Sequence, residues 1–405
     1  MKKKAVSLLL AFVLAFSLCA CETYYNFKEA FFPDTIEIAE IIPDDTIKIG
    51  VFEPLTGDDS EAAAEEIRGI ELAHKLYPEV LGKELVLVYA DNESDDRVAR
   101  QVAEELVGSG VSVVIGSYRN VLSLAGADVF AKARIPAIAV TCTNPLISQS
   151  SQYYSRVCLT DAYQGQSAAR YALGRLNERW YTVFLPEGDD YAATLAEQFT
   201  SELAARLGNE YSVAVVSFPP GTSDFSLYLE KLCLMRTGPI FFPCDAELGQ
   251  EVLFQAKDMG CDFKWIGCNE WAGLAEAALL AGRQDLSFLD GVSFVSDYAG
   301  DRTLSDTAEL FYSAYAETYG GEVPSKNAAL GFDAYLMAVE AIKRAGRPEA
   351  GTLIANKLIN IRGFRGVTGT INMDSNGDPT KDVVINIIEN GEYSAEYIVA
   401  PDWGE

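Results

Sequence analysis

The sequence has few basic residues and almost no histidine. Its 405 residues carry 59 acidic side chains against 32 basic ones, for a net charge of −27, and a single histidine, His74. So acidic a chain repels phosphate backbones, which excludes nucleic acid as a partner. His74 lies within a predicted helix and no G-x-S-x-G motif accompanies it, so the sequence argues against histidine-based nucleophilic catalysis.

Motifs for phosphates and metals are also missing. There is no G-x-x-x-x-G-K-[ST] sequence, and Gly108-Ser109-Gly110 lacks the third glycine of a dinucleotide fingerprint. Residues 374–378 (DSNGD) make a poor calcium loop, because the glycine is misplaced and Ile385 stands where a bidentate glutamate belongs. We expect a hairpin turn there instead. No two cysteines form a C-x-x-C pair, so we predict neither a metal site nor a cofactor.

The first twenty residues have the pattern of an export signal. Residues 2–4 are lysines, and the apolar run 5–16 is shorter than the roughly 20 residues of a membrane-spanning helix. The run ends in LCAC, which fits a bacterial lipoprotein signal cut just before Cys21. We predict a lipid-modified Cys21 as the new N-terminus and a tether over residues 22–45; soluble secretion with cleavage elsewhere is the alternative.

Six cysteines remain beyond Cys21. In an exported protein some of them can oxidise to disulfides, whereas buried free thiols are equally compatible with so large a core. The sequence leaves both states open for Cys142, Cys158, Cys233, Cys244, Cys261 and Cys268.

From Thr46 on, short apolar runs alternate with helical patterns. Ile67, Ile70, Ala73 and Leu76, for example, recur at helical spacing. This alternation predicts an α/β fold with parallel sheets covered by helices, in two successive blocks. We expect strands over 47–51, 85–89, 111–115, 136–140, 181–185, 211–217 and 239–242, and helices over 97–107, 121–132, 166–176, 192–207, 225–235, 247–259, 308–319 and 327–345. A tail rich in glycine and β-branched residues follows over 364–399.

One strand ends in an unusual way. The apolar run 136–140 passes directly into Thr141-Cys142-Thr143-Asn144 and stops at Pro145. In open α/β sheets, ligands bind beyond the carboxyl ends of the strands, which is where these small polar residues stand. The alternative is a plain turn without a binding role.

Seven segments in this order resemble the type I periplasmic binding proteins, in the leucine/isoleucine/valine-binding branch that serves ABC importers. The resemblance runs from about residue 48 to residue 399. Its marks are IGVFEPLTGDDS, VVIGSYRN, IPAIAVTCTNPLI, DDYAATLAEQF, GQEVLFQAKDMGCDFKWIGCNEW, NAALGFDAYLMAVEAI and FRGVTGTINMDSNGDP.

The resemblance implies two Rossmann-like lobes with parallel central sheets, joined by a three-strand hinge and closing on a ligand. Lobe 1 would take residues 46–160 plus 291–363, and lobe 2 residues 161–290 plus 364–405. We expect a monomer that needs no cofactor.

The same resemblance suggests ligand contacts from lobe 1. Asn120 aligns with the small polar residue at a helix start, where backbone N–H groups suit a carboxylate. Thr141, Cys142 and Thr143 align with the strand-end loop that holds the head of an amino acid. Thr143 offers a hydroxyl and an N–H group, and the Thr141 carbonyl can accept from an ammonium.

Lobe 2 would supply the opposing contacts. Tyr191 matches a family tyrosine that closes over the ligand, although Ala192 replaces the glycine that follows it in the family. Glu270 would neutralise the ammonium, with Asn269 as the alternative from gapless alignment. Cys244 and Asp245 align with a further pocket-lining segment.

The side-chain specificity of the family does not carry over. Ala62 stands where the family can place an aromatic residue over the ligand. The resemblance therefore predicts a lipid-anchored, extracytoplasmic protein that captures an amino-acid-like solute and presents it to an ABC permease. A sensor on the same scaffold is the alternative, and an exported hydrolase is disfavoured.

Overall fold

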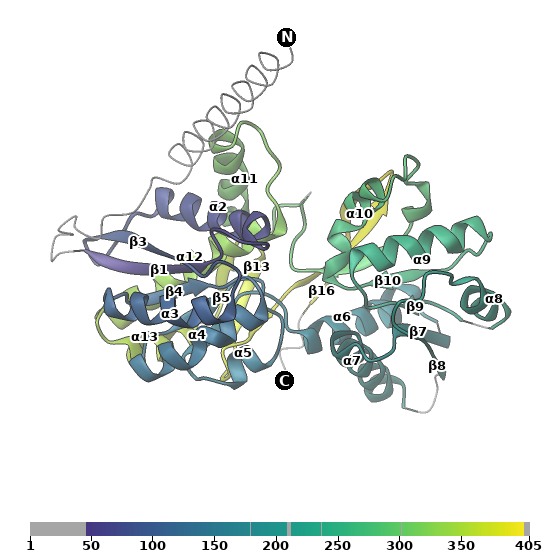
Figure 1. Ribbon diagram of the computed structural model, residues 1–405, viewed down its shortest axis with the longest axis horizontal. Coiled ribbons are helices and arrows are strands. Elements are labelled where there is room, and N and C mark those ends of the chain that lie inside the picture. Colours follow the sequence, from purple (N-terminus) through teal and green to yellow (C-terminus); the bar gives the residue numbers. More distant parts are fainter. Residues whose placement is uncertain (1–45, 179, 209–211, 236, 301, 401–405) are drawn as a thin grey trace, which may run out of the picture. The chain divides into compact units, whose positions relative to one another are not determined.

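The computed structural model describes residues 46–400 except 179, 209–211, 236 and 301 (Figure 1). The chain forms two units, Met1–Thr46 and Ile47–Glu405, and every element named here belongs to the second. The predicted signal, Cys21 and the tether lie outside the described residues. None of the described helices is long and apolar enough to cross a membrane.

The first lobe is built on a six-stranded sheet of order β2-β3-β1-β4-β5-β6. Its strands are parallel except for the short antiparallel pair β2–β3, which confirms the predicted parallel architecture. The strands are β1 (Ile47–Glu53), β2 (Glu79–Val80), β3 (Lys83–Asp91), β4 (Val113–Gly116), β5 (Ala137–Ala139) and β6 (Tyr154–Arg156).

Successive residues of these strands enter two different cores, as the two-residue period of a strand requires. Val113 and Ile115 of β4 pack into one core, and Val114 between them packs into the other. The first core is completed by α2 (Ser60–Leu76), α11 (Asp306–Thr318), α12 (Lys326–Ala345) and α13 (Gly351–Ile359). The second is completed by α3 (Asp96–Gly108), α4 (Asn120–Ala133) and α5 (Leu146–Gln149).

The second lobe is built on a seven-stranded sheet of order β16-β15-β11-β10-β9-β7-β8. Strands β7 to β11 run parallel, and the last two strands of the chain add an antiparallel edge. The strands are β7 (Trp180–Pro186), β8 (Ser212–Phe218), β9 (Ile240–Phe241), β10 (Trp265–Gly267), β11 (Ser293–Ser296), β15 (Val383–Glu389) and β16 (Glu392–Val399).

The helices of the second lobe are α6 (Asp161–Tyr171), the π-helix η1 (Ala172–Leu176), α7 (Asp190–Leu207), α8 (Ser226–Leu234), α9 (Ala246–Asp258), α10 (Leu274–Leu280) and the 3-10 helices η2 (Asn269–Gly273) and η3 (Ser287–Leu289). The predicted helices begin and end close to the expected positions, with one exception, whereas α10, η2 and η3 were not predicted. The prediction for 166–176 starts five residues late, because Thr160 caps α6 by accepting a hydrogen bond from the Tyr163 N–H at 3.2 Å. Cys233 and Cys261 form a disulfide, whereas Cys142, Cys158, Cys244 and Cys268 are free and buried.

The tail divides between the two lobes. We expected all of it in lobe 2, but the small sheet of β12 (Phe364–Gly366), β13 (Gly369–Met373) and β14 (Pro379–Lys381) packs Ile371 and Met373 into a core of the first lobe. Buried Asp333 of α12 fixes this sheet, because its carboxylate accepts from the N–H groups of Val367 at 2.6 Å and Thr368 at 2.9 Å. Conversely β11, which we expected in lobe 1, is hydrogen-bonded within the second sheet.

Within the described residues the chain passes three times between the lobes, after β6, after β11 and after β14. A buried ion pair joins these crossovers: Lys381 Nζ lies 2.9 Å from Asp297 Oδ1. Lys381 also donates to the Val157 carbonyl at 3.1 Å, and Asp297 accepts from the Leu159 N–H at 2.9 Å. One pair of opposite charges therefore contacts all three connections of the predicted hinge.

Candidate functional site

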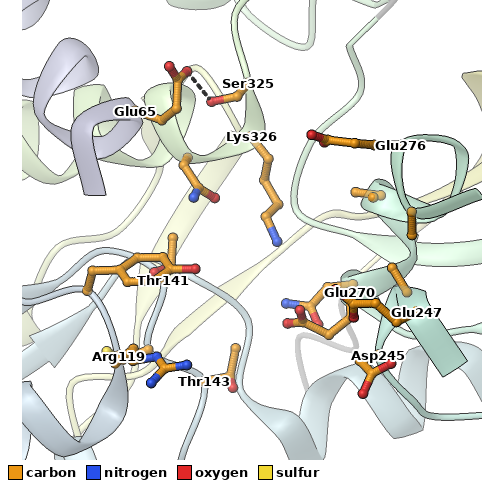
Figure 2. A pocket seen from close by; sticks show the side chains of 18 of the residues that line it. Glu65, Arg119, Thr141, Thr143, Asp245, Glu247, Glu270, Glu276, Ser325 and Lys326 are labelled. Carbon is orange, nitrogen blue, oxygen red and sulfur yellow. Dashed lines mark hydrogen bonds between the residues drawn. The ribbon is translucent and has the colours of Figure 1, made fainter. Parts of the chain in front are cut away.

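A cavity of about 630 Å³ is lined by residues of both lobes (Figure 2). Its walls come from segments beyond the carboxyl ends of β4, β5, β9 and β10, where an α/β fold is expected to bind ligands. The lining residues are Glu65, Tyr118, Arg119, Asn120, Thr141, Cys142, Thr143, Asp245, Ala246, Glu247, Asn269, Glu270, Ala272, Gly273, Glu276, Ala277, Leu280, Ser325, Lys326, Asn327 and Tyr393.

The four residues predicted from the first lobe, Asn120, Thr141, Cys142 and Thr143, all line this cavity. Asn120 is the first residue of α4, and its Oδ1 accepts from the Asn144 N–H at 3.3 Å, which ties the two loops together. No side chain among the described residues caps the start of α4. The unpaired N–H groups of its first turn, with the positive end of the helix dipole, suit an anion.

The Cys142 side chain faces the protein interior. Its Sγ donates to the Ser117 carbonyl at 3.1 Å, and only 2% of the residue is exposed. Burial raises the pKa of the Cys142 thiol well above its ordinary value, so the thiol stays neutral. Cys142 therefore offers the cavity its backbone rather than a reactive sulfur.

The loop from Thr141 to Pro145 is held from behind by Arg156 of β6. This guanidinium is fully buried and donates to the carbonyl oxygens of Cys142 at 2.8 Å and Pro145 at 3.4 Å. Its Nε pairs with Asp378 Oδ1 at 2.7 Å, on the hairpin turn predicted over 374–378. The short polar sequence after β5 is thus a loop whose shape is fixed by Arg156, a residue that was not predicted to have this role.

Three predicted residues line the cavity from the second lobe: Asp245, Asn269 and Glu270. Asp245 caps α9, since its Oδ1 accepts from the Leu248 N–H at 2.7 Å. Glu270 is exposed, and its side chain has no hydrogen bond or ion pair with any described residue. Its carboxylate is therefore available to a ligand, and Figure 2 shows it beside Glu247 on the side opposite Thr141.

Two predicted residues, Tyr191 and Cys244, do not line the cavity. Tyr191 instead donates its hydroxyl to Asn269 Oδ1 at 2.9 Å, so it contacts a lining residue. Cys244 is 2% exposed and directly precedes Asp245. Ala192, where the family motif has glycine, lies in α7, and its N–H donates to the Asp189 cap at 2.9 Å.

Several charged residues that line the cavity were not predicted, above all Lys326. Its side chain projects into the cavity in Figure 2 and makes no ion pair with any described residue. Lys326 is the first residue of α12, a position that the helix dipole disfavours for a cation. That mismatch in PSKNAAL was the available signal. The Glu65 carboxylate, by contrast, already accepts a hydrogen bond from Ser325 Oγ at 2.9 Å and forms an ion pair with Arg68 Nη1 at 3.1 Å.

The arrangement of polar groups in the cavity suits the binding of a small charged solute. The cavity offers hydroxyl and amide groups on the first-lobe side and the carboxylates of Asp245, Glu247, Glu270 and Glu276 on the second-lobe side. Among the described residues, no group of three or more His, Cys, Asp or Glu side chains could hold a metal ion. A small solute with both a negative and a positive group would find partners on opposite walls.

Comparison with known proteins agrees with this geometry. Residues 46–391 match the family model described as periplasmic binding protein. The Leu/Ile/Val-binding protein homolog 2 of Brucella abortus (strain 2308) is 25% identical over 344 residues, which cover 82% of this chain and 88% of the relative.

Two solved structures are also similar over nearly their whole length. The leucine-binding protein LivK of Thermotoga maritima MSB8 is 31% identical with a TM-score of 0.73, covering 88% of this chain and 99% of that one. The branched-chain amino acid transporter substrate-binding protein LivJ of Streptococcus pneumoniae, in complex with isoleucine, is 25% identical with a TM-score of 0.71. That match covers 88% of this chain and all of the other.

Proposed function

Because this chain belongs to the periplasmic binding protein family, in the type I branch of branched-chain amino acid binders, we propose that it is the substrate-binding lipoprotein of an ABC importer. In this role it works outside the cytoplasm as a monomer. It captures an amino-acid-like solute by closure of its two lobes and presents that solute to the permease. The proteins it matches are solute-binding proteins rather than enzymes, which supports a role without catalysis.

The observation that carries the proposal is the polarity of the cavity across its two walls. We assign the carboxylate of the ligand to the first-lobe wall, where Asn120, Thr143 and the uncapped start of α4 line the cavity. The Thr141 carbonyl and the Glu270 carboxylate are the acceptors for an ammonium. This pattern complements the zwitterionic head of an amino acid.

The remaining predicted residues have supporting roles in this proposal. Cys142, Asp245 and Asn269 shape the wall, and Cys244 positions Asp245 from the preceding residue. Tyr191 acts through Asn269, whose side chain it holds.

Calorimetric titration of the purified protein with a panel of L-amino acids tests the proposed ligand class. At least one amino acid should bind. The substitution Glu270→Gln should lower the affinity for that amino acid about thirtyfold or more, because removing one partner of a desolvated charge pair costs at least about 2 kcal/mol of binding free energy. The control Glu197→Gln removes the same charge from the exposed face of α7 and should leave the affinity unchanged. Binding of a sugar or an aromatic acid, with no response to any amino acid, would contradict the proposal.

The lipid anchor is proposed on the LCAC sequence alone. Two or three acyl chains on Cys21 would hold the body at a membrane, at ~0.8 kcal/mol per buried methylene. Cys21→Ser is expected to move the protein from the membrane fraction to the soluble fraction of cells. Retention of this variant in the membrane fraction would exclude Cys21 as the anchor.

A further inference from the structure

Two carboxyl groups lie buried directly behind the cavity. Glu53 ends β1 and Glu66 lies on α2, and both residues are fully buried. Burying one carboxylate is costly, and two that share a site cannot both ionise. Two fully buried carboxyl groups therefore indicate a role other than keeping the protein soluble.

Each carboxyl group holds a residue that lines the cavity. Glu66 Oε1 accepts from the Thr141 hydroxyl at 2.5 Å, and Glu53 Oε2 accepts from the Tyr118 N–H at 2.6 Å. The other two oxygens, Glu53 Oε1 and Glu66 Oε2, have no partner among the described N–H and O–H donors, and the two carboxyl groups interact with each other. A single proton held between the acids satisfies both remaining oxygens.

The bond from Thr141 decides what its hydroxyl can offer a ligand. A hydroxyl has one proton and two acceptor lone pairs. When that proton is donated to an ionised Glu66, Thr141 Oγ1 can only accept. When Glu66 is protonated on Oε1, it can donate to Thr141, which frees the hydroxyl proton and removes a negative charge from behind the cavity wall.

We propose that Glu66 is a positioning residue: its ionised form holds the Thr141 hydroxyl as an acceptor for the ammonium group of the ligand, and Glu53 keeps the shared proton. The inference rests on the proposed function and deepens it. It assigns the ammonium, rather than the carboxylate, to the Thr141 side chain, and it makes ammonium binding depend on the proton content of the pair.

The groups that face the pair support this assignment. Burial raises the pKa of Glu66 to about 7, while the hydrogen bonds from Thr141 and Glu53 and the charge of Lys326 on α12 lower it. Burial and the neighbouring Glu66 raise the pKa of Glu53 well above its ordinary value. The other titratable groups that interact with the pair, Tyr118, Cys142 and Tyr154, also have raised pKa values through burial and stay neutral. Glu66 is thus the member that ionises near neutral pH.

Calorimetry at pH 6, 7 and 8 tests the inference, with L-leucine or whichever amino acid of the panel binds most tightly. If only the form with ionised Glu66 binds well, the wild-type affinity should rise about tenfold from pH 6 to pH 8. Glu66→Gln keeps an amide oxygen to accept from Thr141 but cannot ionise, so its affinity should not vary with pH. Thr141→Val removes the hydroxyl and should also lose the dependence.

Glu71→Gln is the matched control, because Glu71 lies on the same helix, is exposed and contacts Tyr89 rather than the cavity. It should keep the wild-type pH profile. Thermal unfolding of each variant verifies that it is folded. Amino acid binding that is flat from pH 6 to pH 8, or a dependence that persists in Glu66→Gln or Thr141→Val, would overturn the inference while leaving the proposed function intact. If no amino acid binds at any pH, both fail.

Discussion

Arg156 offers the sharpest test of how the fold prepares the cavity. Replacing it by methionine removes a fully buried guanidinium that pairs with Asp378 at 2.7 Å and donates to the Cys142 carbonyl at 2.8 Å and to Ser148 Oγ at 3.0 Å. Removing one partner of a buried ion pair costs about 3–5 kcal/mol, since the other partner is left without its counter-charge. We expect the free energy of unfolding to fall by about that amount.

The same substitution should also weaken ligand binding. Without Arg156 the loop from Thr141 to Pro145 loses the donors that fix two of its carbonyl oxygens. A loop that must be ordered during binding lowers the affinity, because the ordering entropy is then subtracted from the binding free energy. Urea unfolding followed by tryptophan fluorescence should show a midpoint about 1 M lower. Titration with the bound amino acid should show a weaker affinity.

Arg170→Met separates the two effects. Arg170 pairs with Glu202 at 2.7 Å in the second lobe, with side-chain exposures of 15% and 13%, and neither residue lines the cavity. Loss of the Arg170 side chain should lower the free energy of unfolding and leave the affinity for the amino acid unchanged. If Arg156→Met binds the amino acid as tightly as the wild type, the loop does not depend on Arg156 and the reasoning is refuted.

Two further predictions concern buried charge. The folded-state pKa of Glu66 is about 7, above its ordinary value of 4.5, so its contribution to stability is present below pH 4.5 and is lost as the pH rises through 7. Chemical denaturation should show that, from pH 5 to pH 8, the free energy of unfolding of the wild type falls by up to about 3 kcal/mol relative to that of Glu66→Gln. A difference in unfolding free energy that stays constant with pH would contradict this. Lys381→Met should lower the free energy of unfolding by about 3–5 kcal/mol, because Asp297 stays buried without its counter-charge. Adding Asp297→Leu should restore most of the lost stability. Thermal unfolding of the single and double variants checks this, and equal stability of the two would argue against the ion pair.

Local patterns predicted the elements well because burial imposes a period on the sequence. The helix expected over 97–107 is α3, whose start at Asp96 follows the Asp95 cap, and the strand expected over 111–115 is β4, buried on both faces. The carboxyl end of one strand indicated Thr141, and the family resemblance added Asn120; both line the cavity, because parallel strands bring them to the same edge of the sheet.

Contacts between residues distant in sequence were not predictable in this way. Asp333 attaches β12–β14 to the first lobe by accepting hydrogen bonds from the Val367 and Thr368 N–H groups. The periodicity of the sequence does not indicate which carboxylate has this role. Arg156 and Asp378 are likewise 222 residues apart, so neither sequence segment indicates its partner. Glu53 and Glu66 were overlooked because acidic residues are assumed to face solvent, especially in so acidic a chain.

The Lys381–Asp297 pair also constrains how the molecule can move. A rotation of one lobe against the other about this point would leave the two charges together, since Lys381 ends β14 and Asp297 directly follows β11, so both lie in the crossovers. A sideways slip would pull them apart in a medium of low dielectric, where separating opposite charges is expensive. If the two lobes close on a ligand as proposed, this pair would favour rotation about the crossovers over sliding, and the two walls of the cavity would then meet in one fixed alignment.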